Sequence, residues 1–112
     1  LRLSQPTKEV KMQYLNYTPH TVNMNDGREF KSVGVARVEA SFSDPDENGV
    51  VAQVFGDIQG LPDPKQDTIY IVSLVVLQAA KGRDDLVAPA SGHPDTVRND
   101  KGHIVSVPFF VR

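Results

Sequence analysis

Three polar side chains recur at every second position of the segment LNYTPHTV, residues 15–22. They are Asn16, Thr18 and His20. In a strand this spacing places all three on one face. An amide, a hydroxyl and an imidazole on one face could bind the edges of a sugar or a base, and the imidazole could act as a general base. The alternative is a solvent-exposed face on a strand that Pro19 bends or ends.

Two arginines in predicted loops could bind an anionic group. Arg83 is followed by two aspartates, and Arg98 lies just before a predicted turn. Guanidinium groups bind phosphates and carboxylates through two parallel hydrogen bonds. We therefore expect Arg83, oriented by Asp85, and Arg98 to bind the phosphates of a small anionic ligand. The alternative for both arginines is a solvated surface charge.

Ser73 stands where a predicted strand meets a predicted short helix, a place where free backbone N–H groups favour an anion. The alternative role of Ser73 is a plain helix cap. Tyr70 or Tyr17 could stack on a base. The expected ligand-binding residues are therefore Asn16, Thr18, His20, Tyr70, Ser73, Arg83, Asp85 and Arg98.

Other kinds of site find little support in the sequence. The chain has no cysteine, which excludes disulfides and thiolate metal sites. Its three histidines, His20, His93 and His103, form neither a close pair nor a short metal-binding motif, so we expect no metal and no cofactor. Ser73, His20 and Asp85 have the residue types of a catalytic triad, but the sequence lacks the G-x-S-x-G elbow that marks a serine nucleophile. We assign no catalytic residue.

These residues must be positioned by strands and helices, and the sequence patterns predict a mainly β (α+β) fold. The patterns indicate strands, an antiparallel hairpin and one short helix. The strands are expected at 12–17, 21–24, 68–72, 86–89, near 97 and at 103–111, the hairpin at 35–42 and 50–60, and the helix from Ser73 to Gly82. Together, these predicted elements indicate a small curled antiparallel sheet or a partly open barrel of about five to seven strands.

The first strand of the predicted hairpin has an apolar side. Its apolar residues alternate with Arg37 and Glu39, and we expect this apolar set to face the core. Its members are Ala36, Val38, Ala40 and Phe42. On the second strand, Gly56 is expected to mark a bulge or bend.

Length and charge exclude several classes of protein. The 112 residues predict one globular domain, 12–112, preceded by a polar tail, 1–11. The formal net charge is −2 and both signs are mixed along the chain, which argues against binding of duplex nucleic acid. The longest apolar run, 69–80, is too short to cross a membrane, and residues 1–11 lack the apolar part of a signal peptide. We expect a cytoplasmic protein.

Five segments occur in an order that resembles a known family. They are NYTPH (16–20), GLPDP (60–64), YIVS (70–73), GRDDLVAP (82–89) and VRNDKGHI (97–104). The family comprises small uncharacterised proteins of phages, prophages and bacterial chromosomes, with the pattern N-L-T-P-H, G-L-P, Y-I-V-S, R-x-D-L-V-x-P, V-R-D-x-x-G-x-I. Tyr17 and Asn99 depart from this pattern. The resemblance implies a phage or prophage origin and carries no settled activity.

Three functions are compatible with these features. The first is an anti-defence protein that sequesters a small nucleotide immune signal of the bacterial host. The second is a hydrolase of such a nucleotide, with His20 as general base and Asp85 or Ser73 as its partner. The third is a protein-binding inhibitor of a host defence enzyme. For the first we also expect a homo-oligomer, with the apolar segment VSVPFFV, residues 105–111, as a candidate interface.

Overall fold

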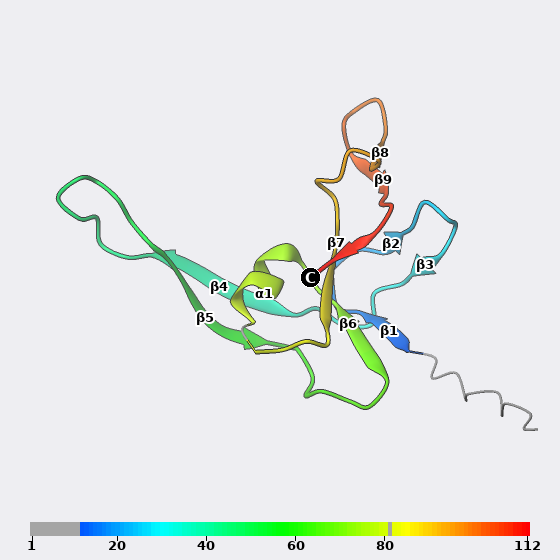
Figure 1. The fold of residues 1–112 in the computed structure, drawn as a ribbon, viewed down its shortest axis with the longest axis horizontal. Coiled ribbons are helices and arrows are strands. Elements are labelled where there is room, and N and C mark those ends of the chain that lie inside the picture. The colour runs from blue at the N-terminus through cyan, green and yellow to red at the C-terminus, as the bar shows by residue number, and fades with distance from the viewer. Residues whose placement is uncertain (1–11, 81) are drawn as a thin grey trace, which may run out of the picture.

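The computed structural model describes residues 12–80 and 82–112 (Figure 1). It contains ten short strands and one short helix, which confirms the predicted mainly β class. The strands form four sheets, one of four strands and three of two, and none of these closes into a barrel. The expected polar tail, residues 1–11, lies outside the described residues.

The four-stranded sheet forms the centre of the molecule. Its strand order is β1 (Gln13–Asn16), β6 (Thr68–Ile71), β7 (Leu86–Pro89) and β10 (Phe110–Val111). β1, β6 and β7 run parallel, and only β10 is antiparallel to its neighbour. The sheet is therefore mixed rather than antiparallel. β6 and β7 are parallel neighbours because the helix α1 (Leu74–Ala79) carries the chain from the end of β6 back to the start of β7.

Three antiparallel ribbons of two strands each surround this sheet. The predicted final strand, 103–111, is divided between two of the sheets because Pro108 cannot donate to a ladder and interrupts it. The ribbons are β2 (Val22–Asn23) with β3 (Glu29–Phe30), β4 (Arg37–Phe42) with β5 (Gln53–Gln59), and β8 (Val97–Arg98) with β9 (Ile104–Ser106).

Both faces of the central sheet are covered by apolar side chains. On one face Ile69 and Ile71 pack in a cluster that includes Val22 and Met24 of the β2–β3 ribbon. On the other face Tyr70 and Val72 pack with Val76 of α1, in a cluster that also contains Ala36 and Leu86. Burial on both faces explains why this part of the sequence is a nearly continuous apolar run rather than an alternating one.

The β4–β5 ribbon, called the arm below, leaves this body and extends away from it (Figure 1). Ala36 is buried and Val38 is half-buried, but Ala40 is exposed and 70% of Phe42 is exposed. The prediction that the whole apolar set faces the core is therefore wrong for its outer half. Alternation fixes which side chains share a face of a ribbon, but not how far the body extends beneath that face.

Candidate functional site

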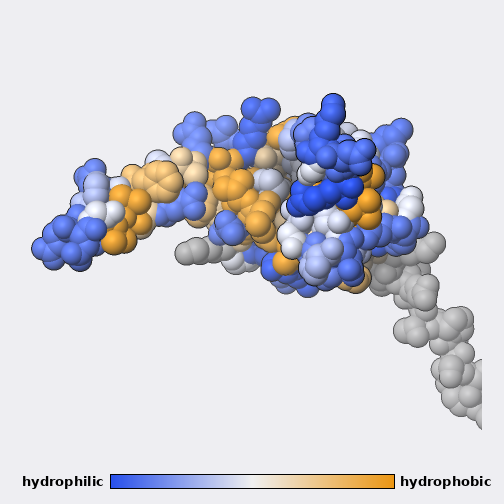
Figure 2. Space-filling view, turned by 90° about the horizontal axis from the view of Figure 1, so that it is seen from above, coloured by the Kyte–Doolittle hydropathy of each residue, from blue (hydrophilic) through white to orange (hydrophobic). Residues whose placement is uncertain are grey.

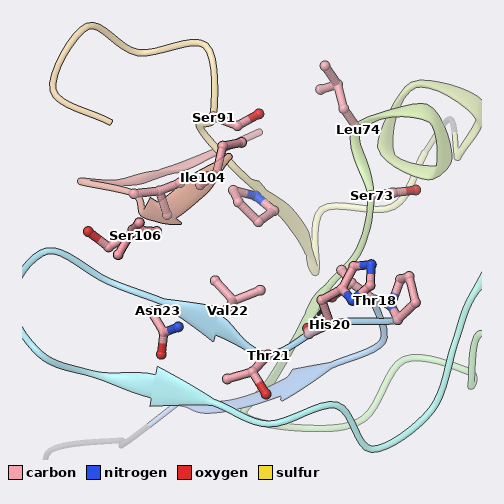
Figure 3. A pocket seen from close by; sticks show the side chains of 14 residues that line it. Thr18, His20, Thr21, Val22, Asn23, Ser73, Leu74, Ser91, Ile104 and Ser106 are labelled. Carbon is pink, nitrogen blue, oxygen red and sulfur yellow. Dashed lines mark hydrogen bonds between the residues drawn. The ribbon is translucent and has the colours of Figure 1, made fainter. Parts of the chain in front are cut away.

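A pocket of about 480 Å³ lies at the carboxyl ends of the three parallel strands (Figure 3). Thr18 lies two residues after β1, Ser73 lies two residues after β6, and Ser91 lies two residues after β7. In open sheets with parallel strands, ligands bind outside this edge because the loops that follow the strands converge there. The order of the elements therefore places the pocket where a binding site is expected.

The opposite wall of the pocket comes from β2 and β9. Val22 points into the pocket, whereas Thr21 and Asn23 point away from it (Figure 3). Ile104 and Ser106 of β9 lie across from Val22. The pocket thus combines an apolar wall with several hydroxyl groups, the composition that suits a small organic ligand.

A buried turn holds the first edge of the pocket. The Asn16 side chain is 1% exposed, and its amide donates to the carbonyl oxygens of His20 and Phe30, both at 2.8 Å. Asn16 Oδ1 accepts from the backbone N–H of Thr18 at 2.9 Å and lies 2.6 Å from the Thr18 hydroxyl. The polar face of the segment 15–22 is therefore not a solvent face. Asn16 and Thr18 close the turn that presents His20.

His20 and Ser73 retain polar groups that can meet a ligand. The His20 imidazole is exposed at the pocket, and it is the only titratable side chain among the described residues that line it. Ser73 caps α1, as predicted, because its Oγ accepts from the N–H of Val76 at 3.4 Å. Its hydroxyl proton stays free to donate to a ligand.

Arg98 lies beside the pocket. Its guanidinium donates to the carbonyl oxygen of Gly102 at 2.9 Å and to that of Ser91 at 3.2 Å. Ser91 lines the pocket, so this second hydrogen bond fixes the guanidinium next to the pocket rim. Arg98 has no carboxylate partner in the described part of the chain, so its charge is not neutralised by an ion pair.

Arg83 and Asp85 lie elsewhere and bind each other. Arg83 Nε and Nη2 donate to the two oxygens of Asp85 at 2.9 and 2.8 Å, and Nη2 also donates to the carbonyl oxygen of Pro62 at 3.1 Å. The guanidinium lies 5.8 Å from the centre of the Tyr70 ring, and the Tyr70 hydroxyl donates to the carbonyl oxygen of Asp63 at 3.1 Å. These contacts, called the Arg83 brace below, tie the loop of residues 60–67 to β6 and β7.

The electrostatics of the Arg83 brace follow from these contacts. The hydrogen bonds from Arg83 lower the pKa of Asp85, and the same bonds raise the pKa of Arg83. Burial raises the pKa of the Tyr70 hydroxyl. Both members of the ion pair therefore stay charged across the neutral range, and most of their donors and acceptors are already occupied by protein groups.

The structure thus separates the expected site residues into two groups. Thr18, His20 and Ser73 line the pocket, with Asn16 behind them and Arg98 at the rim. The Arg83 brace contains Tyr70, Arg83 and Asp85, and none of these three lines the pocket.

Sequence reasoning did not single out Ser91, Ser106 or Ile104 as pocket residues. The signal that could have identified Ser91 is the order of strand, short helix and strand over residues 68–89. This order predicts parallel neighbours, and the loop after the second strand then joins the loop after the first at one edge of the sheet.

Two further observations concern metals and membranes. Across residues 12–80 and 82–112, no group of three or more His, Asp or Glu side chains is arranged to hold a metal ion. In the same residues no helix combines the length and the apolar character needed to cross a membrane.

Comparison with known proteins adds no family or structural neighbour to this description. No protein-family model matches the chain, and searches of curated proteins and of solved structures returned no match. A functional assignment therefore depends on the chemistry of the pocket and its surroundings.

Proposed function

We propose that the chain binds and sequesters a small nucleotide-like ligand in the pocket at the carboxyl ends of β1, β6 and β7. The observation that supports this proposal is the meeting of Thr18, His20 and Ser73 at one edge of an apolar pocket of about 480 Å³. This volume lies within the range of small-molecule sites. In the phage setting that the sequence resemblance implies, the ligand is a nucleotide immune signal of the host.

The lining of the pocket suits the two halves of such a ligand. A flat base or ribose can lie against the apolar wall of Val22, Ile104 and Val107, while the imidazole and serine hydroxyls bind its polar edges. No carboxylate is present among the described lining residues, so a phosphate is not repelled from within. Arg98 at the rim supplies a cation for that phosphate.

Binding is favoured over hydrolysis by what surrounds His20. A general base needs a partner that orients it, and the expected partner, Asp85, is held by Arg83 in the brace. Ser73 lines the same pocket, but its Oγ accepts the hydrogen bond that caps α1. Among residues 12–80 and 82–112, the pocket therefore has groups that can hold a ligand, and none of its lining residues pairs with His20 to activate water.

The test is a thermal-shift and calorimetric screen of the purified chain with nucleotides, including cyclic dinucleotides and cyclic ADP-ribose isomers. A ligand at about one hundred times its Kd should stabilise the fold by about 2.7 kcal/mol. Ligand recovered after heat denaturation should be chemically unchanged. Altered ligand would favour the hydrolase, and a chain that binds no nucleotide while retaining a stoichiometric host protein would favour the protein-binding inhibitor.

A further inference from the structure

The arm carries an apolar face whose outer part no other described residue covers. Register places Val38, Ala40 and Phe42 on one face of β4, with Ile58 and Phe55 opposite the first two. Val38 and Ile58 pack against the core, and the same face continues outward to Phe42, which is 70% exposed. Figure 2 shows hydrophobic side chains at the surface of the projecting arm.

Such a ribbon is not expected to stand alone. A two-stranded hairpin is marginally stable in water, and a continuous exposed apolar patch marks an interaction surface. The register shift between Val38 and Ala40 sets Glu39 against Gly56 and Asp57, which is a bulge. A bulge increases twist and disfavours pairing along strand edges, so the interaction is expected through the apolar face.

The charge of the arm favours a partner surface that carries cations. Residues 37–59 contain one basic residue, Arg37, and five acidic ones, Glu39, Asp44, Asp46, Glu47 and Asp57. The arm therefore has a formal net charge of −4. An arm of this charge is attracted to a surface that carries a net positive charge.

One surface of the body combines exposed apolar side chains with unpaired cations. It comprises residues 97–112, where Val105 is 48% and Phe109 58% exposed. Arg98, Lys101 and Arg112 outnumber the single acid of this segment, and none of them pairs with a carboxylate in the described part of the chain. This segment is called the C-terminal surface below. The arm points away from the C-terminal surface of its own chain (Figure 1).

We propose that the arm lies against the C-terminal surface of a second copy, and that two copies exchange arms reciprocally in a twofold dimer. A ribbon about 23 Å long and 10 Å wide presents roughly 230 Å² of flat face, and as much on its partner. One such contact is below the size of a stable interface, whereas two reciprocal contacts bury roughly 900 Å² before the relief of the side chains is counted, near the lower limit of a specific interface. This area is what favours reciprocal exchange over a single contact.

The test is sedimentation velocity of the full chain over a concentration series without nucleotide, so its result is independent of ligand binding. The expected species has twice the mass of the 12.3 kDa chain. Phe42→Asp should raise the dimer Kd by at least about 30-fold, because it places a charge on the most exposed part of the apolar face. Val33→Asp is the matched control, since Val33 is 59% exposed and lies outside both surfaces.

A charge reversal tests the identity of the partner surface and does not depend on the folding of Phe42→Asp. Glu47 and Lys101 are both exposed. Glu47→Lys and Lys101→Glu should each weaken the dimer about 5- to 10-fold, and combining them should restore most of the loss. A chain that is monomeric at every concentration, a Phe42→Asp dimer as tight as the wild type, or a double variant weaker than either single variant would overturn the proposal.

Discussion

The pocket and the Arg83 brace are both built from polar residues around the central sheet, but they differ in what those residues leave free. In the brace, the guanidinium of Arg83 is held by the Asp85 carboxylate and by the carbonyl oxygen of Pro62. At the pocket, the imidazole of His20 stays exposed. A polar group already bound by protein contributes to folding, and one presented at a cavity is available to a ligand.

Removing the buried amide behind the pocket should have the largest effect. Asn16→Ala deletes an amide that donates to two carbonyl oxygens and accepts from Thr18. We expect a loss of about 3 kcal/mol in the free energy of unfolding, because buried partners are left unpaired. Urea denaturation measures this loss, with exposed Asn48→Ala as the control. A loss equal to that of the control would show that the turn does not depend on Asn16.

Arg83→Ala should separate the two regions. We expect it to lower the free energy of unfolding by about 2 kcal/mol, since it leaves the Asp85 carboxylate without its main partner. Nucleotide affinity at the pocket should change less than about twofold, because Arg83 does not line it. Loss of nucleotide binding with an unchanged free energy of unfolding would instead make Arg83 a ligand contact. It would contradict the distinction between the pocket and the Arg83 brace.

The brace should also make stability depend on pH in a specific way. The folded-state pKa of Asp85 is lowered, chiefly by the hydrogen bonds from Arg83. The contribution of Asp85 to the free energy of unfolding is therefore complete above its unfolded-state pKa of about 3.9. It is lost as the pH falls through the folded-state pKa. The stability difference between wild type and Asp85→Asn should shrink in acid. A gap that widens in acid would contradict this account.

His20→Ala should have the smallest effect on stability and the clearest one on binding. The His20 side chain is exposed, so we expect less than about 0.5 kcal/mol of change in unfolding. Loss of one good polar contact should weaken nucleotide binding by about 10-fold in calorimetry. His103→Ala, an exposed histidine outside the pocket, is the matched control. Equal affinities of the two variants would remove His20 from the site.

Local patterns were sufficient for several elements of the fold. The buried strand at Thr68–Ile71 follows from an apolar run, and the start of α1 follows from Ser73 as its cap. The long hairpin and its irregularity at Gly56 follow from alternation and a glycine. The exposure of Phe42 and the mixed order of the central sheet did not follow, because both depend on where distant parts of the chain lie.

The candidate site was predictable to the same extent. Thr18 and His20 share one turn, so their proximity is local, and Ser73 joins them because β1 and β6 are parallel neighbours. We expected Arg83 to meet these residues, which depends on contacts between distant parts of the chain. Arg83 instead binds Asp85, two positions further along the chain. Opposite charges two positions apart, such as Arg83 and Asp85, can form a local ion pair instead of meeting at a shared ligand site.

The parallel pairing of β1 with β6 also has a consequence for the order of folding. Gln13 pairs with Thr68, 55 positions further along the chain, and the whole arm lies in the intervening loop. Closing so long a loop is slow, whereas β6, α1 and β7 are close neighbours in sequence. We expect β6, α1 and β7 to associate early and β1 to dock late. The turn of residues 16–20 would then reach the pocket only near the end of folding. Until then, the edge of β6 that pairs with β1 would stay unpaired.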